Sequence, residues 1–277
     1  MDWLTEQKIP LGKWIKVGVD ILNDHAAGVF DWISLVLGSG IEGMIYLMLA
    51  CPPLILIGLF TAFAWWLHRS LKLALTIIAS LLLIINLGYW ESTMETLALV
   101  VVSTLVCLLA GVPLGIAAAH RPWLYRILRP ILDLMQTVPT FVYLIPALIL
   151  FGLGVVPGVI STVVFAIPAA IRLTHLGISS VPKTMLEAVE SFGATPRQLL
   201  WKVELPHAKK TIMAGMTQCI MLSLSMVVIA ALVGAGGLGK PVVRALNTVN
   251  VAMGFEAGLA IVLIAILLDR VCKTREK

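Results

Sequence analysis

The sequence predicts an all-α fold, a polytopic membrane helical bundle of about seven spans, and three observations support this prediction. First, 60% of the 277 residues are hydrophobic and 13% are charged, whereas soluble domains average about 45–50% and about 25%. Second, apolar stretches long enough to cross a bilayer recur along the chain. Third, basic residues concentrate between alternate stretches, as membrane insertion requires. A water-soluble fold of this size could not bury so much apolar surface.

Residues 1–43 precede the first predicted span and mix aromatic and aliphatic side chains with charges. We expect one or two amphipathic helices on the outer face of the membrane, with Trp3, Trp14 and Trp32 at the depth of the lipid headgroups. A short soluble cap is the alternative for this segment.

Seven apolar stretches are candidate spans, because about 20 apolar residues cross a bilayer as a helix. They are Met44–Leu67, Leu73–Tyr89, Thr96–Ala119, Leu134–Phe151, Val155–Leu176, Thr211–Val233 and Gly254–Leu268. The fourth and fifth form one uncharged block too long for one span, and Gly152, Gly154 and Pro157 favour a turn within it. In the third, Gly111 and Gly115 share a helix face, which permits a neighbouring helix to approach closely.

The basic residues predict the orientation of the chain. If the loop after the first span lies inside, 15 of the 20 Lys and Arg residues fall on the inner side. Cytoplasmic segments carry the excess of positive charge, so we expect a multi-pass protein of the bacterial inner membrane, with its N-terminus outside. The membrane domain then covers residues 44–270, and residues 271–277 form a cytoplasmic tail. The same asymmetry explains the net charge of +5 without a nucleic-acid partner.

The longest inner loop, residues 177–210, is the most informative segment of the sequence. It is polar, and it favours two short helices joined by a break. Met185–Phe192 is a helical run that Gly193 ends. Thr195 caps a second helix, which we expect Pro206 to end. Such a rigid bracket could dock into a groove of a soluble partner, and a plain solvated loop is the alternative.

This loop also carries a sequence motif with a fixed spacing. The motif consists of Glu187, Ala188, Val189, Gly193, Val203, Leu205 and Pro206. In type and spacing it closely resembles the EAA loop of ABC-importer permeases, in which EAA, three residues, G and nine residues precede I-x-LP. The stretches RPILDLMQTVPTFVYLIPAL and LSMVVIAALVGAGGLG are further similar to permeases of the ProU/OpuA type, which import glycine betaine, proline betaine or choline. This resemblance covers most of residues 87–270.

The resemblance implies a permease subunit that moves a quaternary-ammonium compatible solute, in the arrangement of a type I ABC importer. It also implies four kinds of partner: a second copy of the chain, a cytoplasmic ABC ATPase, an external substrate-binding protein and membrane lipid. The ATPase would use ATP and Mg²⁺, while this chain would bind no cofactor and would not be an enzyme. The residues expected to couple the chain to the ATPase are Glu187, Ala188, Gly193, Arg197, Leu205 and Pro206.

Candidate path residues follow from the chemistry of such a solute. Aromatic faces attract a quaternary ammonium group through cation–π contacts, and small polar side chains would accompany them. The candidates are Met135, Gln136, Thr137, Phe141, Tyr143, Ser223, Ser225 and Met226. Ordinary core packing is the alternative for each of these residues.

Two other functions are compatible with a helical membrane bundle. An ion-coupled secondary transporter of a small solute is the main one, but such carriers commonly keep ionisable residues within the bilayer. Here Glu256 and Asp269 fall at the ends of a predicted span. An intramembrane enzyme would need a buried nucleophile and base or metal ligands. The five histidines and four cysteines show no ligand spacing, and we expect every histidine to be solvated or interfacial.

The glycine-rich stretch Gly234–Lys240 is similar to a phosphate-binding loop, but it lacks a decisive residue. That loop needs Ser or Thr after the lysine to hold Mg²⁺, and Pro241 stands there instead. We therefore expect a glycine-rich hinge, followed by a short outer helix near Lys240–Val251.

Overall fold

The computed structural model describes residues 10–272, and within this range every regular element is a helix. The all-α prediction is therefore confirmed for the described part of the chain. Residues 1–9 and 273–277 lie outside it, so Trp3 and most of the expected tail are not placed.

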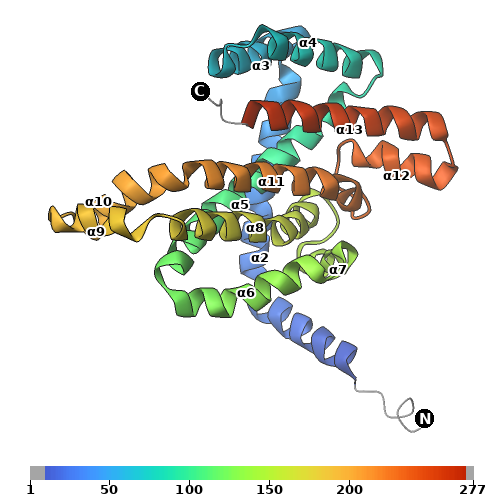
Figure 1. Cartoon of the computed structure of the whole chain (residues 1–277). Coiled ribbons are helices and arrows are strands. Elements are labelled where there is room, and N and C mark those ends of the chain that lie inside the picture. Colours follow the sequence, from blue (N-terminus) through green and yellow to red (C-terminus); the bar gives the residue numbers. More distant parts are fainter. Residues whose placement is uncertain (1–9, 273–277) are drawn as a thin grey trace, which may run out of the picture.

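The helices form a bundle in which most long axes run side by side (Figure 1). In chain order they are α2 (Leu11–Ala50), α3 (Pro53–His68), α4 (Leu71–Asn86), α5 (Trp90–His120), α6 (Pro122–Thr137), α7 (Thr140–Phe151), α8 (Val155–Ser179), α9 (Lys183–Ser191), α10 (Pro196–Leu199), the π-helical segment η1 (Leu200–Glu204), α11 (Leu205–Ala231), α12 (Gly239–Thr248) and α13 (Val251–Cys272).

Five of the seven predicted spans correspond to single helices, namely α4, α5, α8, α11 and α13. By length and composition, five described helices could cross a membrane, or six if α6 and α7 together form one broken span. The helices α3 and α4 are apolar but shorter, at 16 residues each. The predicted short helix after the glycine-rich stretch is confirmed as α12.

The two remaining span predictions, Met44–Leu67 and Leu134–Phe151, are wrong because prolines divide them. Pro52 forces Cys51 into an extended conformation, with ψ 130°, so α2 ends there and α3 begins anew. Pro139 acts in the same way on Val138, with ψ 131°, and α6 and α7 meet at 98°. The apolar stretch continues across both breaks, so a prediction of spans from hydropathy alone does not detect the breaks.

The N-terminal segment forms one helix, within the one or two that the sequence predicts, but this helix extends beyond the predicted segment. Helix α2 continues through residue 43, where this segment was expected to end. It runs across α8 and α11 rather than alongside them (Figure 1). The Phe30 ring lies 5.4 Å from that of Phe151 at the end of α7, and Ile41 packs against Leu99 and Val159. All these contacts lie at the end of the bundle opposite α9 and α10.

Helices α5, α8 and α11 form the tightly packed centre of the fold. A Cβ atom at Gly111 of α5 would lie 2.7 Å from the Cβ of Ala170, and one at Gly115 would lie 2.6 Å from that of Thr174. The predicted close approach at these two glycines is therefore confirmed, and α8 is the neighbour. A Cβ atom at Gly158 of α8 would lie 2.9 Å from the Cβ of Ala230 in α11.

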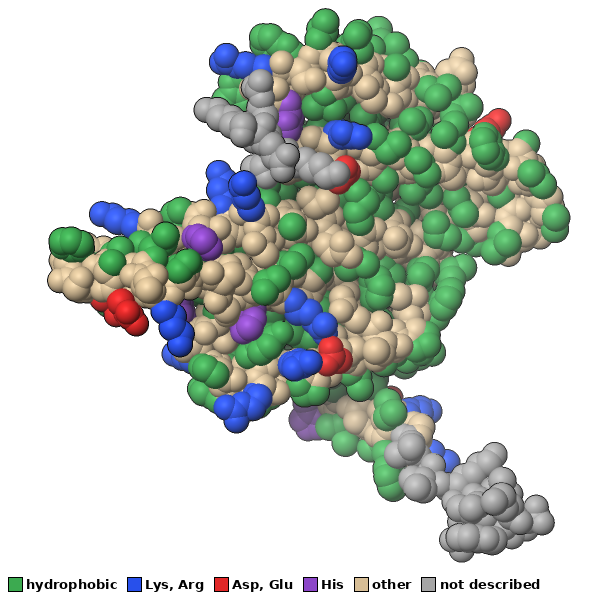
Figure 2. All heavy atoms as spheres, viewed as in Figure 1, with side chains coloured by type: hydrophobic (Ala, Val, Ile, Leu, Met, Phe, Trp, Pro, Cys, Tyr) green, Lys and Arg blue, Asp and Glu red, His purple; other side chains and the backbone are tan. Residues whose placement is uncertain are grey.

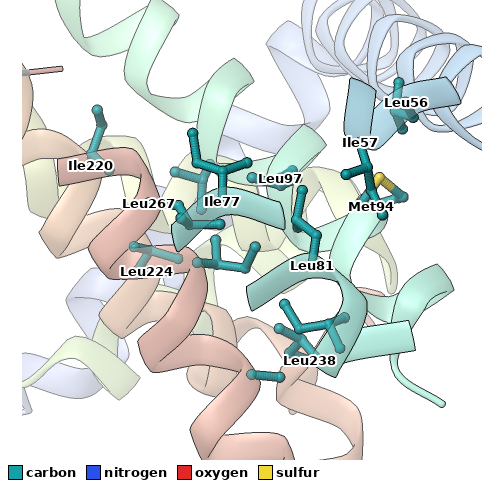
Figure 3. Packing of buried hydrophobic residues seen from close by; sticks show 14 of the residues in the cluster. Leu56, Ile57, Ile77, Leu81, Met94, Leu97, Ile220, Leu224, Leu238 and Leu267 are labelled. Carbon is teal, nitrogen blue, oxygen red and sulfur yellow. The ribbon is translucent and has the colours of Figure 1, made fainter. Parts of the chain in front are cut away.

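A larger apolar cluster joins α3, α4, α5, α11 and α13 (Figure 3). Its labelled members are Leu56, Ile57, Ile77, Leu81, Met94, Leu97, Ile220, Leu224, Leu238 and Leu267. In lipid the hydrophobic effect does not drive helices together, so close packing and interhelical hydrogen bonds must stabilise the bundle. Many exposed side chains are large and apolar, such as Trp66 at 70% and Leu109 at 75%, as a lipid-facing surface requires.

Candidate coupling site and transport path

The predicted bracket is present, and α9 and α10 form a projection at one end of the bundle (Figure 1). Gly193 ends α9 in the left-handed region, with φ +81°, and its N–H donates to the Glu190 carbonyl at 2.8 Å. Glycine adopts this conformation without the steric penalty that a Cβ brings. The predicted role of Gly193 as the end of the first helix is therefore confirmed.

The second helix of the bracket begins as the sequence predicts. The Thr195 hydroxyl accepts from the N–H of Gln198, and the Thr195 N–H donates to the Gln198 side chain at 2.9 Å. This reciprocal capping box satisfies two backbone donors at the start of α10. The angle between α9 and α10 is thus set by a glycine and a cap, both local to the bracket.

The expected end of the second helix at Pro206 is wrong. The chain stays helical from α10 through η1 into α11, and Pro206 occupies the first turn of α11. In η1 the hydrogen bonds span five residues, as from the Leu205 N–H to the Leu200 carbonyl. Proline has no backbone N–H to donate, and a local π-helical adjustment of this kind accommodates a proline within a continuous membrane helix. Single π-helical turns of this kind are frequent at functional sites.

The surface of the bracket is free for a partner. No residue of α9 or α10 is buried, and Phe192 at the tip is 92% exposed. Figure 2 shows hydrophobic side chains at this tip, with acidic and basic side chains beside them. The predicted residues Glu187, Ala188 and Arg197 are all exposed on the bracket.

The remaining predicted coupling residues lie at the base of the bracket. Leu205 is half-buried and Pro206 is exposed, both at the start of α11. The predicted coupling residues therefore form a tip on α9–α10 and a base where the bracket joins the bundle.

Five candidate path residues gather where α6 meets α7. The Tyr143 hydroxyl of α7 donates back to the Met135 carbonyl of α6 at 2.8 Å. Gln136 and Thr137 are exposed, and the Phe141 side chain is 56% exposed. The break at Pro139 therefore leaves the aromatic Phe141 and the polar Gln136 and Thr137 exposed on either side of it.

The other three candidates lie on α11 and differ in exposure. Ser223 and Met226 are buried at 1% and 0% exposure, while Ser225 is exposed and donates to the Met221 carbonyl at 3.0 Å. The Ser223 hydroxyl has no hydrogen-bond partner among the described residues. Within this chain, Ser223 and Met226 contribute to the helical core.

The sequence analysis did not predict the contacts of α5 with the segments that come just before and just after α11. At one end, His120 Nε2 lies 2.9 Å from a carboxylate oxygen of the buried Glu204. At the other, the carboxylate of Glu95 accepts from the N–H of Gly237 at 2.5 Å. The 45% exposure of the His120 side chain agrees with the expected solvated or interfacial position, but its pairing with a buried carboxylate was not predicted. The sequence gives no local sign of a partner 84 positions away.

The chain is a bundle of apolar helices with a projecting helical bracket in which no residue of α9 or α10 is buried, an arrangement suited to a membrane subunit that docks a soluble partner. Residues 111–272 match the family described as the binding-protein-dependent transport system inner membrane component. The chain belongs to this family, and the resemblance drawn from the EAA loop is confirmed.

Similarity to individual proteins supports the assignment of the chain to this family. The glycine betaine transport system permease protein OpuAB of Bacillus subtilis is 48% identical over 264 residues, which cover 95% of this chain and 93% of that protein. The glycine betaine/carnitine transport permease protein GbuB of Listeria monocytogenes is 46% identical over 272 residues, covering 97% and 96%. A chain of the inward-facing MetNI methionine ABC transporter gives a TM-score of 0.57 at 25% identity, covering 63% of this chain and 88% of that one. The predicted type I importer fold is confirmed by this likeness.

Proposed function

We propose that this chain is the membrane-embedded permease of an ABC importer for a quaternary-ammonium compatible solute, with glycine betaine as the first candidate. The observation that carries the proposal is the exposed α9–α10 bracket, which presents the EAA-type motif on a helical membrane bundle. The choice of solute is supported by the names of the relatives, which transport glycine betaine in both cases cited.

The proposed partners follow from the two exposed surfaces. A cytoplasmic ATPase would receive the bracket, with Phe192 entering an apolar pocket and Glu187 and Arg197 forming charged contacts at its rim. A second copy of the chain would pack so that the α6–α7 surface, with Phe141 and Gln136, faces the path. An external binding protein would deliver the solute at the opposite end. ATP and Mg²⁺ would be bound by the ATPase alone.

The proposed mechanism is alternating access driven by the ATPase. Closure of the ATPase dimer would draw the two brackets together and open the path outward. Release after hydrolysis would return it to the inward state. Rigid-body movement of packed helices is the expected form of such a change, because close-packed cores switch between discrete arrangements.

Transport measurements distinguish this function from a secondary transporter. The chain, its ATPase and its binding protein are reconstituted in liposomes, and uptake of radiolabelled glycine betaine and choline is measured. We expect uptake to require internal ATP and the ATPase subunit, and vanadate to abolish it. Uptake driven by a sodium or proton gradient without the ATPase would instead establish the secondary transporter.

The proposed orientation places α9 and α10 in the cytoplasm and the turn before α8 outside. Phe192 and Leu153 are suitable labelling positions, at 92% and 78% exposure. In a background whose four native cysteines are replaced, we expect an impermeant maleimide to label Leu153→Cys in intact cells. Phe192→Cys should react only after the membrane is permeabilised. The opposite pattern would reverse the topology.

A further inference from the structure

The bracket is built into α11 rather than hinged to it. From Pro196 to Ala231 the chain runs as one helical element through α10, η1 and α11. A helix resists bending far more than a loop does, so a displacement of α10 must move the start of α11. How this movement reaches the rest of the bundle depends on what holds α11 at its two ends.

At the bracket end, α11 is bonded to the last residue of α5. His120 Nε2 lies 2.9 Å and 3.1 Å from the two carboxylate oxygens of Glu204. A carboxylate can only accept, so the imidazole N–H donates to it. Glu204 is 4% exposed and is the last residue of η1. An acidic side chain buried to this degree is costly without a partner, so the pairing holds α5 to the π-helical turn.

At the opposite end, α5 is bonded to the loop that follows α11. The N–H of Gly237 donates to the Glu95 carboxylate, and the N–H of Leu238 donates to the Thr96 hydroxyl at 2.8 Å. A Cβ atom at Gly236 would lie 2.7 Å from a Glu95 carboxylate oxygen. The loop is therefore fixed on α5, and it is not the free hinge that its glycines suggest.

We propose that His120 and Glu204 are positioning residues that transmit movement of the α9–α10 bracket to α5. Because α5 also holds the loop at Gly237, α5 and α11 are joined at both ends and move as one rigid unit. A movement at the bracket end is thereby passed to the opposite end of the bundle. This inference rests on the proposed function, since the movement is driven by a docked ATPase. Without the contact between His120 and Glu204, the bracket would still bind the ATPase. The displacement of the bracket would then deform η1 and would not reach α5.

The test measures ATP hydrolysis and glycine betaine uptake in the same liposomes, which contain the complete transporter with its ATPase and binding protein. For His120→Ala and Glu204→Gln we expect hydrolysis at the wild-type rate and uptake per ATP reduced by about tenfold, within the range of typical coupling between sites. The exchanged double variant, His120→Glu with Glu204→His, should recover part of the lost uptake.

Asp133→Asn is the matched control, because it breaks the second ion pair found among the described residues. Asp133 joins α6 to Arg172 of α8 at 2.6 Å, so this ion pair involves neither α5 nor α11. Its uptake per ATP should equal that of the wild type. An unchanged ratio in both single variants would overturn the proposal, as would a proportional fall of hydrolysis and uptake, which indicates a merely structural role.

Two further outcomes are separable. If Glu204→Gln does not fold, His120→Ala decides the question, since the His120 side chain is 45% exposed and its truncation lets water reach the Glu204 carboxylate in place of the imidazole. If the wild-type complex shows no ATP-driven uptake, the proposed function fails before any variant is compared.

Discussion

Replacing Gly193 with valine is expected to abolish most ATP-driven uptake while leaving the protein inserted and folded. At φ +81°, a Cβ at this position meets the backbone rather than a neighbour, since nothing else lies within 4 Å. Left-handed backbone costs an L-residue about 1–2 kcal/mol, and a β-branched side chain is worse. The bracket would relieve this strain by changing the angle between α9 and α10, which moves Phe192 and Glu187 away from the positions in which we propose that they contact the ATPase.

The expected loss of uptake is about tenfold or more, because each 1.4 kcal/mol lost from coupling between two sites changes it by a factor of ten. The measurement is uptake and ATP hydrolysis in liposomes, with membrane insertion checked separately. Gly193→Asn is the matched control, because asparagine tolerates the left-handed region, and it should retain most uptake. Wild-type uptake in the valine variant would show that the angle of the bracket does not matter.

Local signals explain why this part of the structure could be predicted from sequence. Gly193 and Thr195 determine the bend of the bracket through their own backbone and the next few residues, so one sequence suffices to read them. The spans of α5, α8, α11 and α13 were likewise predictable, because an uninterrupted apolar stretch has few alternatives in a bilayer. Gly111 and Gly115 indicated close packing, although they could not indicate that α8 is the partner.

The failures share a different cause. Pro52 and Pro139 interrupt stretches whose hydropathy is continuous, and whether a proline kinks or ends a membrane helix depends on neighbouring helices that satisfy its backbone. Pro206 was expected to end a helix, but the π-helical turn before it lets the helix continue. The pairing of His120 with Glu204 joins positions 84 apart, and only the packing of α5 on α11 brings them together.

Replacing Gly239 with alanine is expected to destabilise the fold more than any other glycine-to-alanine change in the described chain. A Cβ atom there would clash severely with the Val227 carbonyl oxygen and would lie 2.8 Å from the carbonyl carbon. Because the obstacle is the backbone of α11, no change of rotamer can relieve it. Helix α12 would have to move away, which would strain the bonds from the preceding loop to Glu95 and Thr96.

The cost combines overpacking, about 1–3 kcal/mol, with the weakening of two hydrogen bonds worth about 0.5–1.5 kcal/mol each. We expect a lower melting temperature and a smaller monodisperse fraction on size exclusion in detergent. Gly258→Ala is the control, because that glycine lies in α13 with open space around its Cβ position. Alanine is favoured over glycine within a helix by about 0.5–1 kcal/mol, so this variant should melt at or above the wild-type temperature. Equal melting of the two variants would mean that α12 can shift at no cost, and that the loop on α5 does not fix its position.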